Sequence, residues 1–230
     1  MKRSEINGVI REFEAMLSKY SFALPPYLSF SPEVWETLGE EYDEIRDCAL
    51  GWDVTDYGLG DYNSVGLALI TLRNGKANDG KYKKTYAEKI MMLREGQLSP
   101  NHFHHSKMED IINRGGGEVI FRLWNAAEDD GLSDTDVEVY RDGRRYKVPA
   151  GSEIVLSTGE SLTLHPRCYH EFTVKVGTGP ALIGEVSKCN DDNTDNRFYE
   201  PVARFPEIEE DEAPYRLLCG EYPRAKSDRG

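Results

Sequence analysis

The stretch from residue 94 to residue 125, REGQLSPNHFHHSKMEDIINRGGGEVIFRLWN, contains three of the five histidines of the chain. His102 and His104 lie two positions apart, and side chains with this spacing share one face of a β-strand. Both imidazoles can therefore reach one metal ion. Glu109 follows further along, so a turn or bulge must intervene before its carboxylate points the same way. The stretch predicts a strand that carries metal ligands, followed by a turn.

The chain beyond residue 65 reads as short strands separated by turns. Apolar segments occupy 65–73, 86–95, 118–126, 161–164, 170–176 and 181–188. The dipeptides Asn74-Gly75 and Asp142-Gly143 are typical of tight hairpins. Strands of this length without a βαβ rhythm favour a mainly β fold, a sandwich or a barrel. The glycines at 115–117 precede a strand rather than a helix, which indicates a barrel corner and not a phosphate loop.

Residues 1–50 read as helical. Apolar residues recur at steps of three and four in SEINGVIREFEAMLSKY, residues 4–20, which predicts an amphipathic helix capped by Ser4. A second helix is expected in SPEVWETLGEEYDEI, residues 31–45. Ser31 would be its N-cap, and Pro32 would take its first helical position.

Composition narrows the class of protein. The chain has 230 residues, 39% of them hydrophobic and 30% charged, with a formal net charge of −13. A surface this negative repels phosphate backbones and anionic membranes, so neither nucleic acid nor a membrane is the expected partner. No stretch approaches the ~18 apolar residues of a membrane span. The start of the chain lacks the apolar core of a signal peptide, and we therefore expect a cytoplasmic protein.

A fourth metal ligand must come from elsewhere, and His170 at the start of an expected strand can supply it. His165, which lies ahead of the preceding turn, is the rival. His105 would point to the face opposite His102 and is not expected to be a ligand. Three imidazoles and one carboxylate suit a divalent ion such as manganese, iron, zinc, nickel or cobalt. On a six-coordinate ion they leave two cis positions for substrate or water.

The spacing of these residues resembles the first metal-binding motif of the cupin superfamily. The matching positions are Gly96, His102, His104, Glu109 and Gly116. The second cupin motif is matched less well, because the interval from Pro166 to His170 is one residue short and Val174 replaces the expected asparagine. Arg167-Cys168 also stands where a glycine would be expected in the turn, which puts the pocket wall near His170 in doubt.

A narrower resemblance, to the D-lyxose isomerase family of cupins, covers residues 50–212. It is carried by LGWDVTDYGLGDY, LRNG, GQLSPNHFHHSKMEDIINRGGG, EVSKCNDDNTDNRF and RFPEIEEDE. The resemblance implies a double-stranded β-helix barrel, one divalent metal ion per subunit (typically manganese) and a homodimer. It also implies interconversion of D-lyxose with D-xylulose, and of D-mannose with D-fructose. We expect a single cupin domain over 1–230, with a helical extension at 1–50, the barrel at 51–212 and a tail at 213–230.

Isomerisation of this kind moves one proton between C2 and C1, and it needs a carboxylate that is not bound to the metal. Glu185, flanked by apolar residues in a strand, is the candidate base. Burial inside a barrel would raise its pKa towards neutrality. Lys107, between the proposed ligands, is the second candidate catalytic residue, because it can hold or protonate a substrate oxygen. Lys89 is a candidate substrate contact.

The segment 191–197 is rich in acidic residues and is interpreted in two ways. Asp192 and Arg197 could bind sugar hydroxyls as substrate contacts. The segment could equally be a self-capped loop beside the dimer contact.

Two other functions remain open from the sequence. The same four ligands around iron serve cupin dioxygenases, and a sugar-binding cupin without activity would keep the barrel. The segments KMEDIINRGGG and NDDNTDN fit the isomerase, and a retained ligand set with a candidate base argues against a binding protein. We therefore predict a metal-dependent aldose–ketose isomerase.

Overall fold

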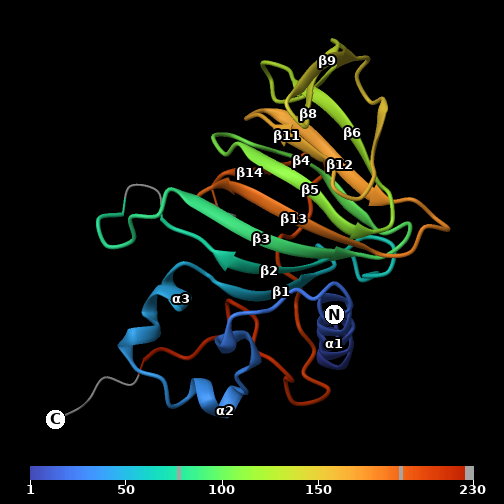
Figure 1. The fold of residues 1–230 in the computed structure, drawn as a ribbon. Helices are drawn as coiled ribbons and strands as arrows, with labels where there is room; N and C mark the ends of the chain where they lie inside the picture. The colour runs from blue at the N-terminus through green and yellow to red at the C-terminus, as the bar shows by residue number, and fades with distance from the viewer. Residues whose placement is uncertain (77–78, 192–193, 226–230) are drawn as a thin grey trace.

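The computed structural model describes residues 1–76, 79–191 and 194–225. Within them the fold is mainly β, with antiparallel strands curled into a barrel and helices near the N-terminus (Figure 1). The helices are α1 (Arg3–Lys19), η1 (Pro26–Ser29), α2 (Pro32–Trp35), η2 (Glu40–Tyr42) and α3 (Asp43–Asp47). The strands are β1 (Gly51–Thr55), β2 (Leu67–Arg73), β3 (Tyr86–Leu93), β4 (Leu98–His104), β5 (Glu109–Gly116), β6 (Val119–Ala126), β7 (Leu132–Ser133), β8 (Val137–Arg141), β9 (Arg144–Val148), β10 (Glu153–Leu156), β11 (Ser161–Leu164), β12 (Cys168–Val174), β13 (Ala181–Lys188) and β14 (Asn196–Phe198).

Two antiparallel sheets form the barrel. One has the strand order β1-β2-β3-β13-β5-β11-β8-β9, and the other has the order β10-β6-β12-β4-β14 with β7 beside β6. Buried and partly exposed residues alternate along β5 and β6, so each strand turns one face inward. The inward faces of both sheets enclose an apolar core around Phe121, Leu123, Leu162 and Phe172. The predicted mainly β fold is confirmed.

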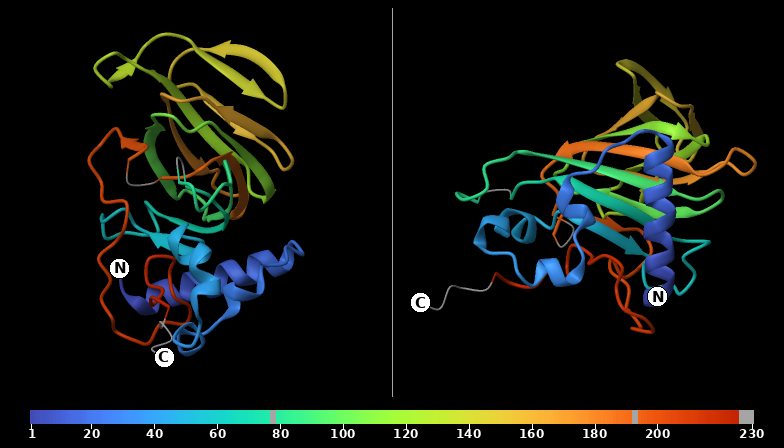
Figure 2. Two further views of the ribbon diagram at one scale, coloured as in Figure 1. Left: turned by 90° about the vertical axis from the view of Figure 1, so that its left-hand side faces the viewer. Right: turned by 60° about the horizontal axis from the view of Figure 1, so that its bottom comes forward.

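A second apolar layer lies on the outer side of the first sheet. The buried face of α1 contributes Ile6, Ile10 and Phe13, which pack with Trp52 of β1 and Ile70 of β2. Figure 2 shows α1 crossing this end of the molecule, on the side away from β8 and β9. Strands β1 to β3 are therefore largely buried on both faces, and this layered edge lies beside β13 in the sheet.

The helical predictions are confirmed only in part. Helix α1 begins at Arg3 with Lys2 as N-cap, so Ser4 is not the cap, and its hydroxyl instead donates to Asp211. Segment 31–45 is not one helix. Ser31 and Pro32 do begin α2, but that helix ends at Trp35, and Gly39 adopts an extended conformation before η2 and α3. The extended Gly39 keeps the chain from resuming α2 and separates it from η2 and α3.

The two predicted hairpins differ in outcome. Asp142 and Gly143 both adopt positive φ values, 50° and 77°, and join β8 to β9 in the predicted tight turn. Strands β2 and β3 do pair antiparallel, but β3 begins only at Tyr86, so Asn74-Gly75 opens a longer loop. Gly75 is needed there for a close approach, because a Cβ atom would collide with the carbonyl oxygen of Lys84.

The glycines at the end of β5 mark the predicted corner. Gly116 has a φ of 90°, and a Cβ atom on it would collide with the carbonyl oxygen of Pro180. The backbone therefore passes too close to the next strand for any side chain, which supports the corner interpretation.

Among the described residues, no helix combines the length and apolar character needed to cross a bilayer.

Candidate functional site

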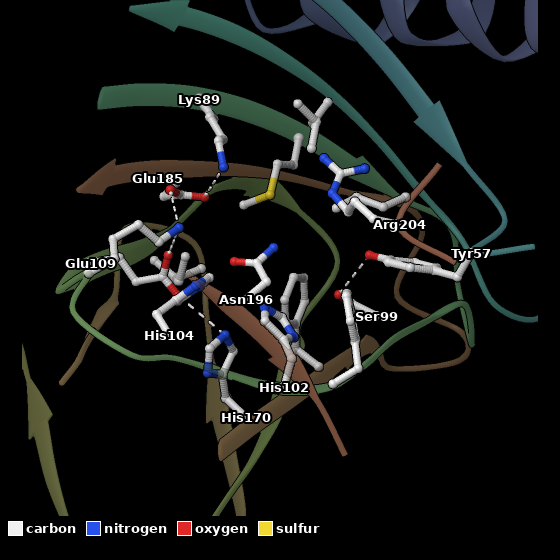
Figure 3. Close-up of a pocket in the computed structure, with 17 residues that line it drawn as sticks. Tyr57, Lys89, Ser99, His102, His104, Glu109, His170, Glu185, Asn196 and Arg204 are labelled. Atoms are coloured by element: carbon white, nitrogen blue, oxygen red, sulfur yellow. Dashed lines mark hydrogen bonds and ion pairs between the residues drawn. The ribbon is translucent and has the colours of Figure 1, made fainter. Parts of the chain in front are cut away.

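Three histidines meet inside the barrel. His102 and His104 project from the same face of β4, and His170 of β12 lies directly opposite His102 in the strand register. One ring nitrogen from each histidine lies within 4.8 Å of the others. Figure 3 shows the three rings on one side of a pocket, facing its interior. The even spacing along a strand and one cross-strand pair therefore create the cluster.

Glu109 closes this cluster. It is the first residue of β5, after the turn at 105–108, and only 3% of its surface is exposed. Its Oε1 atom lies 3.3 Å from Nε2 of His104 and 3.2 Å from Nε2 of His170. The turn that the sequence requires before Glu109 therefore exists, and it brings the carboxylate to the histidines.

Asp195 stabilises the turn at 105–108 by accepting hydrogen bonds from it. Its carboxylate accepts hydrogen bonds from the backbone N–H of Ser106 at 2.8 Å, the hydroxyl of Ser106 at 2.7 Å and the backbone N–H of Lys107 at 3.0 Å. Burial would raise the pKa of Asp195, but these donors outweigh it and hold the pKa below its usual value. An ionised Asp195 thus fixes the backbone between His104 and Glu109.

Backbone carbonyl groups orient two of the rings. Nδ1 of His102 lies 2.8 Å from the carbonyl oxygen of Pro100, and Nδ1 of His170 lies 3.0 Å from that of Cys168. A carbonyl oxygen can only accept, so Nδ1 carries the proton in both residues. Nε2 then keeps its lone pair for the pocket, which is the arrangement typical of metal-binding histidines.

The charges of the cluster suit a cation. Burial, together with the neighbouring His170 and His104, lowers the pKa of His102 far below its usual value, so this ring is neutral. Burial would raise the pKa of Glu109, but Lys107 and His104 outweigh it and hold the pKa well below the usual value. Neutral imidazoles and an ionised carboxylate are the donors that a borderline divalent ion requires. The residues present therefore fit a metal ion.

A second cluster of charges adjoins the first. Glu185 of β13 is 5% exposed, and its Oε1 atom lies 3.0 Å from Nζ of Lys107. Lys107 also contacts Oε2 of Glu109 at 2.7 Å, and Lys89 of β3 lies 3.5 Å from Oε2 of Glu185. Asn190 accepts from both ammonium groups. Lys107 thus bridges the carboxylates of Glu109 and Glu185, and Figure 3 shows Glu109, Glu185 and Lys89 close together at one side of the pocket.

The predicted rise in the pKa of Glu185 is wrong. Burial does act in that direction, but the ammonium groups of Lys107 and Lys89 outweigh it and lower the pKa below its usual value. Glu185 is therefore ionised at neutral pH. A buried carboxylate with two cationic partners stays charged because the charges are compensated locally.

The rest of the pocket wall was not singled out from the sequence, except for Asn196, which belongs to the segment 191–197 that was considered for contact with sugar hydroxyls. Its polar members are Tyr57, Ser99, Asn196 and Arg204, and apolar members such as Met91 and Phe198 lie between them. Tyr57 has a φ of 54°, and the carboxylate of Asp56 accepts from the backbone N–H groups that follow it. The DYG sequence at 56–58 was the available signal, since an aspartate followed two positions later by glycine is typical of a turn in which the carboxylate accepts from the backbone N–H of the glycine. A mixed wall of this kind suits a small polar molecule.

Some predicted residues lie elsewhere. Arg197 alternates with Asn196 and Phe198 on β14 and points away from the pocket, where its Nε atom is 3.5 Å from Oδ2 of Asp130. Asp192 lies outside the described residues. His165, the rival ligand, packs against the ring of Tyr140 and borders a separate pocket.

The turn before His170 forms although Arg167-Cys168 stands where a glycine would be expected. Arg167 adopts a φ of 63°, the conformation for which glycine would be expected. Its guanidinium group donates to Asp130 at 2.8 Å and to the carbonyl oxygen of Ala127 at 2.7 Å. Its backbone N–H donates to the carbonyl oxygen of His104. These bonds hold a strained arginine in place and keep β12 beside β4.

Comparison with known proteins agrees with this geometry. A family model described as D-lyxose isomerase matches residues 1–222. The chain is 48% identical to the D-lyxose/D-mannose isomerase of Serratia proteamaculans over 225 residues, which are 97% of this chain and 99% of that protein. It is also 48% identical to the D-lyxose/D-mannose isomerase of Escherichia coli O157:H7 over 223 residues, which are 96% of this chain and 98% of that protein.

Solved structures confirm the barrel fold. The L-ribose isomerase of Acinetobacter sp. DL28 in complex with L-ribose superposes with a TM-score of 0.63 at 15% identity, covering 91% of this chain and 98% of that one. The L-ribose isomerase of Cellulomonas parahominis with L-ribose gives a TM-score of 0.61 at 17% identity, with the same coverage of 91% and 98%. At this level of identity the likeness concerns the fold alone.

Proposed function

The chain belongs to the D-lyxose isomerase family and is a sugar isomerase, and on that premise we propose that it interconverts D-lyxose with D-xylulose and D-mannose with D-fructose. The observation that carries the proposal is the meeting of two clusters in one buried pocket. Three histidines and Glu109 form one, and Glu185 with Lys107 and Lys89 forms the other. The first suits a metal ion, and the second suits proton transfer.

We propose that His102, His104, His170 and Glu109 hold one divalent ion per subunit. The ion that we favour is manganese, and zinc, cobalt, nickel or iron would suit the same donors. When bound, the ion supplies Lewis-acid chemistry at the substrate oxygens. The proposed metal site is supported by the orientation of two rings. In His102 and His170 a backbone carbonyl oxygen holds Nδ1, so Nε2 is directed away from that carbonyl group.

Glu185 is the proposed base. It is ionised and lines the same pocket as the histidines, and a carboxylate in this position can take a proton from one carbon of the sugar and return it to the next. Lys107, at 3.0 Å from Glu185, can donate a hydrogen bond to a substrate oxygen on which negative charge develops. Lys89 is the proposed substrate contact on the same wall, and Asp192 stays a prediction.

A homodimer is proposed from the family. Two exposed apolar side chains, Tyr86 at 49% and Val186 at 46% exposure, occur on the adjacent strands β3 and β13. Such residues are available for contact with a second copy.

The proposed function is tested by incubating the protein with D-lyxose, D-mannose or L-ribose without oxygen, after removal of metal and again after addition of each divalent ion. D-xylulose should form from D-lyxose, and D-fructose from D-mannose, only when metal is present. Because an isomerase consumes no oxidant, exclusion of oxygen should leave the rate unchanged. Failure to convert D-lyxose and D-mannose with every ion would reject the proposal, whether or not L-ribose is converted, and a requirement for oxygen would favour the dioxygenase alternative.

A further inference from the structure

Two asparagines that do not line the pocket, Asn74 and Asn190, are linked by hydrogen bonds to the two lysines that do, Lys89 and Lys107. Asn74 follows β2 and Asn190 follows β13, the two strands that flank β3. Because β3 begins only at Tyr86, the chain segments after β2 and β13 can meet beyond its end. Asn74 is 5% exposed, and it lies in the LRNG segment, where the expected tight turn does not occur.

Asn74 fixes the backbone of Asn190. Its Oδ1 atom accepts from the backbone N–H of Asn190 at 2.9 Å, and its Nδ2 donates to the carbonyl oxygen of Asn190 at 3.1 Å. Nδ2 also lies 3.2 Å from the carbonyl oxygen of Cys48, which ties the side chain to the segment before β1. One side chain thus satisfies both backbone groups of Asn190, as a neighbouring strand would.

Asn190 in turn contacts both lysines of the pocket. Its Oδ1 atom accepts from Nζ of Lys89 at 2.8 Å and from Nζ of Lys107 at 3.3 Å. The contact with Lys89 is shorter than the 3.5 Å between that ammonium group and Oε2 of Glu185. The amide oxygen of Asn190 therefore shares the ammonium group of Lys89 with Glu185 and keeps the ion pair from closing further, while Lys107 bridges Glu185 and Glu109.

We propose that Asn74 and Asn190 are positioning residues for the isomerisation: Asn74 holds Asn190, and Asn190 holds the two ammonium groups in the places from which they serve Glu185 and the substrate. This inference rests on the proposed function. Without the amide oxygen, Lys89 is free to close onto Glu185, and Lys107 loses one of the groups that fix its direction. Displacement of a catalytic group by about 1 Å can reduce the rate about 100-fold.

The test compares Asn74→Ala with Asn7→Ala as a matched control. Asn7 is also buried, and its side-chain amide also bonds the backbone of a distant segment, at Ala213 and Tyr215, but it lies on α1 away from the pocket. For Asn74→Ala we expect kcat to fall about 10- to 100-fold, as for residues that orient catalytic groups. Bound metal should change little, whereas KM should rise because Lys89, the proposed substrate contact, is displaced as well. Asn7→Ala should lower thermal stability and leave kcat unchanged.

Variants of Asn190 show whether Asn74 acts through it. Asn190→Leu removes the acceptor and should lower kcat as far as Asn74→Ala does. Asn190→Asp keeps an acceptor for both ammonium groups and should retain most of the activity. The double variant Asn74→Ala/Asn190→Leu should be no slower than Asn190→Leu alone, because residues acting in one chain of contacts are not additive.

Three results would overturn the inference: wild-type kcat in Asn74→Ala, an equal fall of kcat in Asn7→Ala, or additive losses in the double variant. A wild-type protein that converts no sugar would instead reject the proposed function. In that case crystal structures of the wild type and of Asn74→Ala still decide the positioning role. Ammonium groups of Lys89 and Lys107 that keep their places without Asn74 would contradict it.

Discussion

Replacing His170 with glutamine is expected to remove the bound metal ion and nearly all of the isomerase activity. His170 is 1% exposed, its Nδ1 is held by the carbonyl oxygen of Cys168, and its Nε2 faces Glu109 at 3.2 Å. Glutamine fills a similar volume but offers the ion no aromatic nitrogen. Lewis-acid stabilisation is worth several kcal/mol, so kcat/KM should fall by about 1000-fold or more. Elemental analysis of the dialysed variant and steady-state kinetics measure both effects.

His165→Gln is the matched control for this prediction. It makes the same substitution at the rival histidine, which packs on Tyr140 and borders a different pocket. We expect it to keep its metal and its activity. If His165→Gln lost the ion while His170→Gln kept it, the assignment of the fourth ligand would be wrong.

Replacing Glu185 with glutamine is expected to remove the base while leaving the metal site intact. The two side chains have nearly the same shape, and the amide oxygen can still accept from Lys107. Glutamine cannot take up the proton, and general-base catalysis contributes about 100- to 10,000-fold. The fall should appear in kcat, with metal content unchanged, because Glu109, and not Glu185, is the carboxylate that contacts the nitrogens of His104 and His170.

Glu171→Gln is the control for the loss of a carboxylate on a barrel strand. Glu171 follows His170 on β12, but its carboxylate is bound by Arg122 at 3.1 Å, and it does not line the pocket. This variant should be as active as the wild type. Full activity in Glu185→Gln would remove Glu185 from the mechanism and leave the identity of the base open.

The ligand cluster could be predicted because its geometry is largely local. The interval between His102 and His104 places both on one face of any regular strand, and β4 pairs with β14 without a register shift from His102 to His104. The irregularity in its pairing with β12 lies before His102. The position of Glu109 after a short turn follows from the same stretch. His170 required the further assumption that its strand pairs with β4, and its register opposite His102 bears this out.

The position of Arg197 outside the pocket has a physical reason. Strand β14 is short and follows a loop, so its inward face cannot be inferred from hydrophobic alternation. Pairing with β4 sets that face, since Asn196 lies opposite His104 and Phe198 lies opposite His102. The charged residue between them is therefore turned outward. Without knowledge of this register, the sequence favours Arg197 over Asn196 as a substrate contact, because a guanidinium group is the more obvious ligand for sugar hydroxyls.

The charge state of Glu185 was misjudged because it depends on distant residues. The apolar neighbours of Glu185 in sequence indicate burial, which is correct, and burial alone would raise its pKa. Lys107 comes from the turn before β5, and Lys89 comes from the adjacent strand β3. Neither contact can be read from the residues around Glu185, although together they reverse the direction of the shift.

The most direct test of the account is a metal titration of the metal-free protein with Mn²⁺, in which the bound metal and the rate of D-lyxose isomerisation are measured on the same samples. The proposed site predicts that activity is absent without metal, rises in proportion to the bound metal and stops rising at one ion per chain. Full activity in protein shown to be free of metal, or a rise that continues to two ions per chain, would contradict the proposed single metal centre at His102, His104, His170 and Glu109.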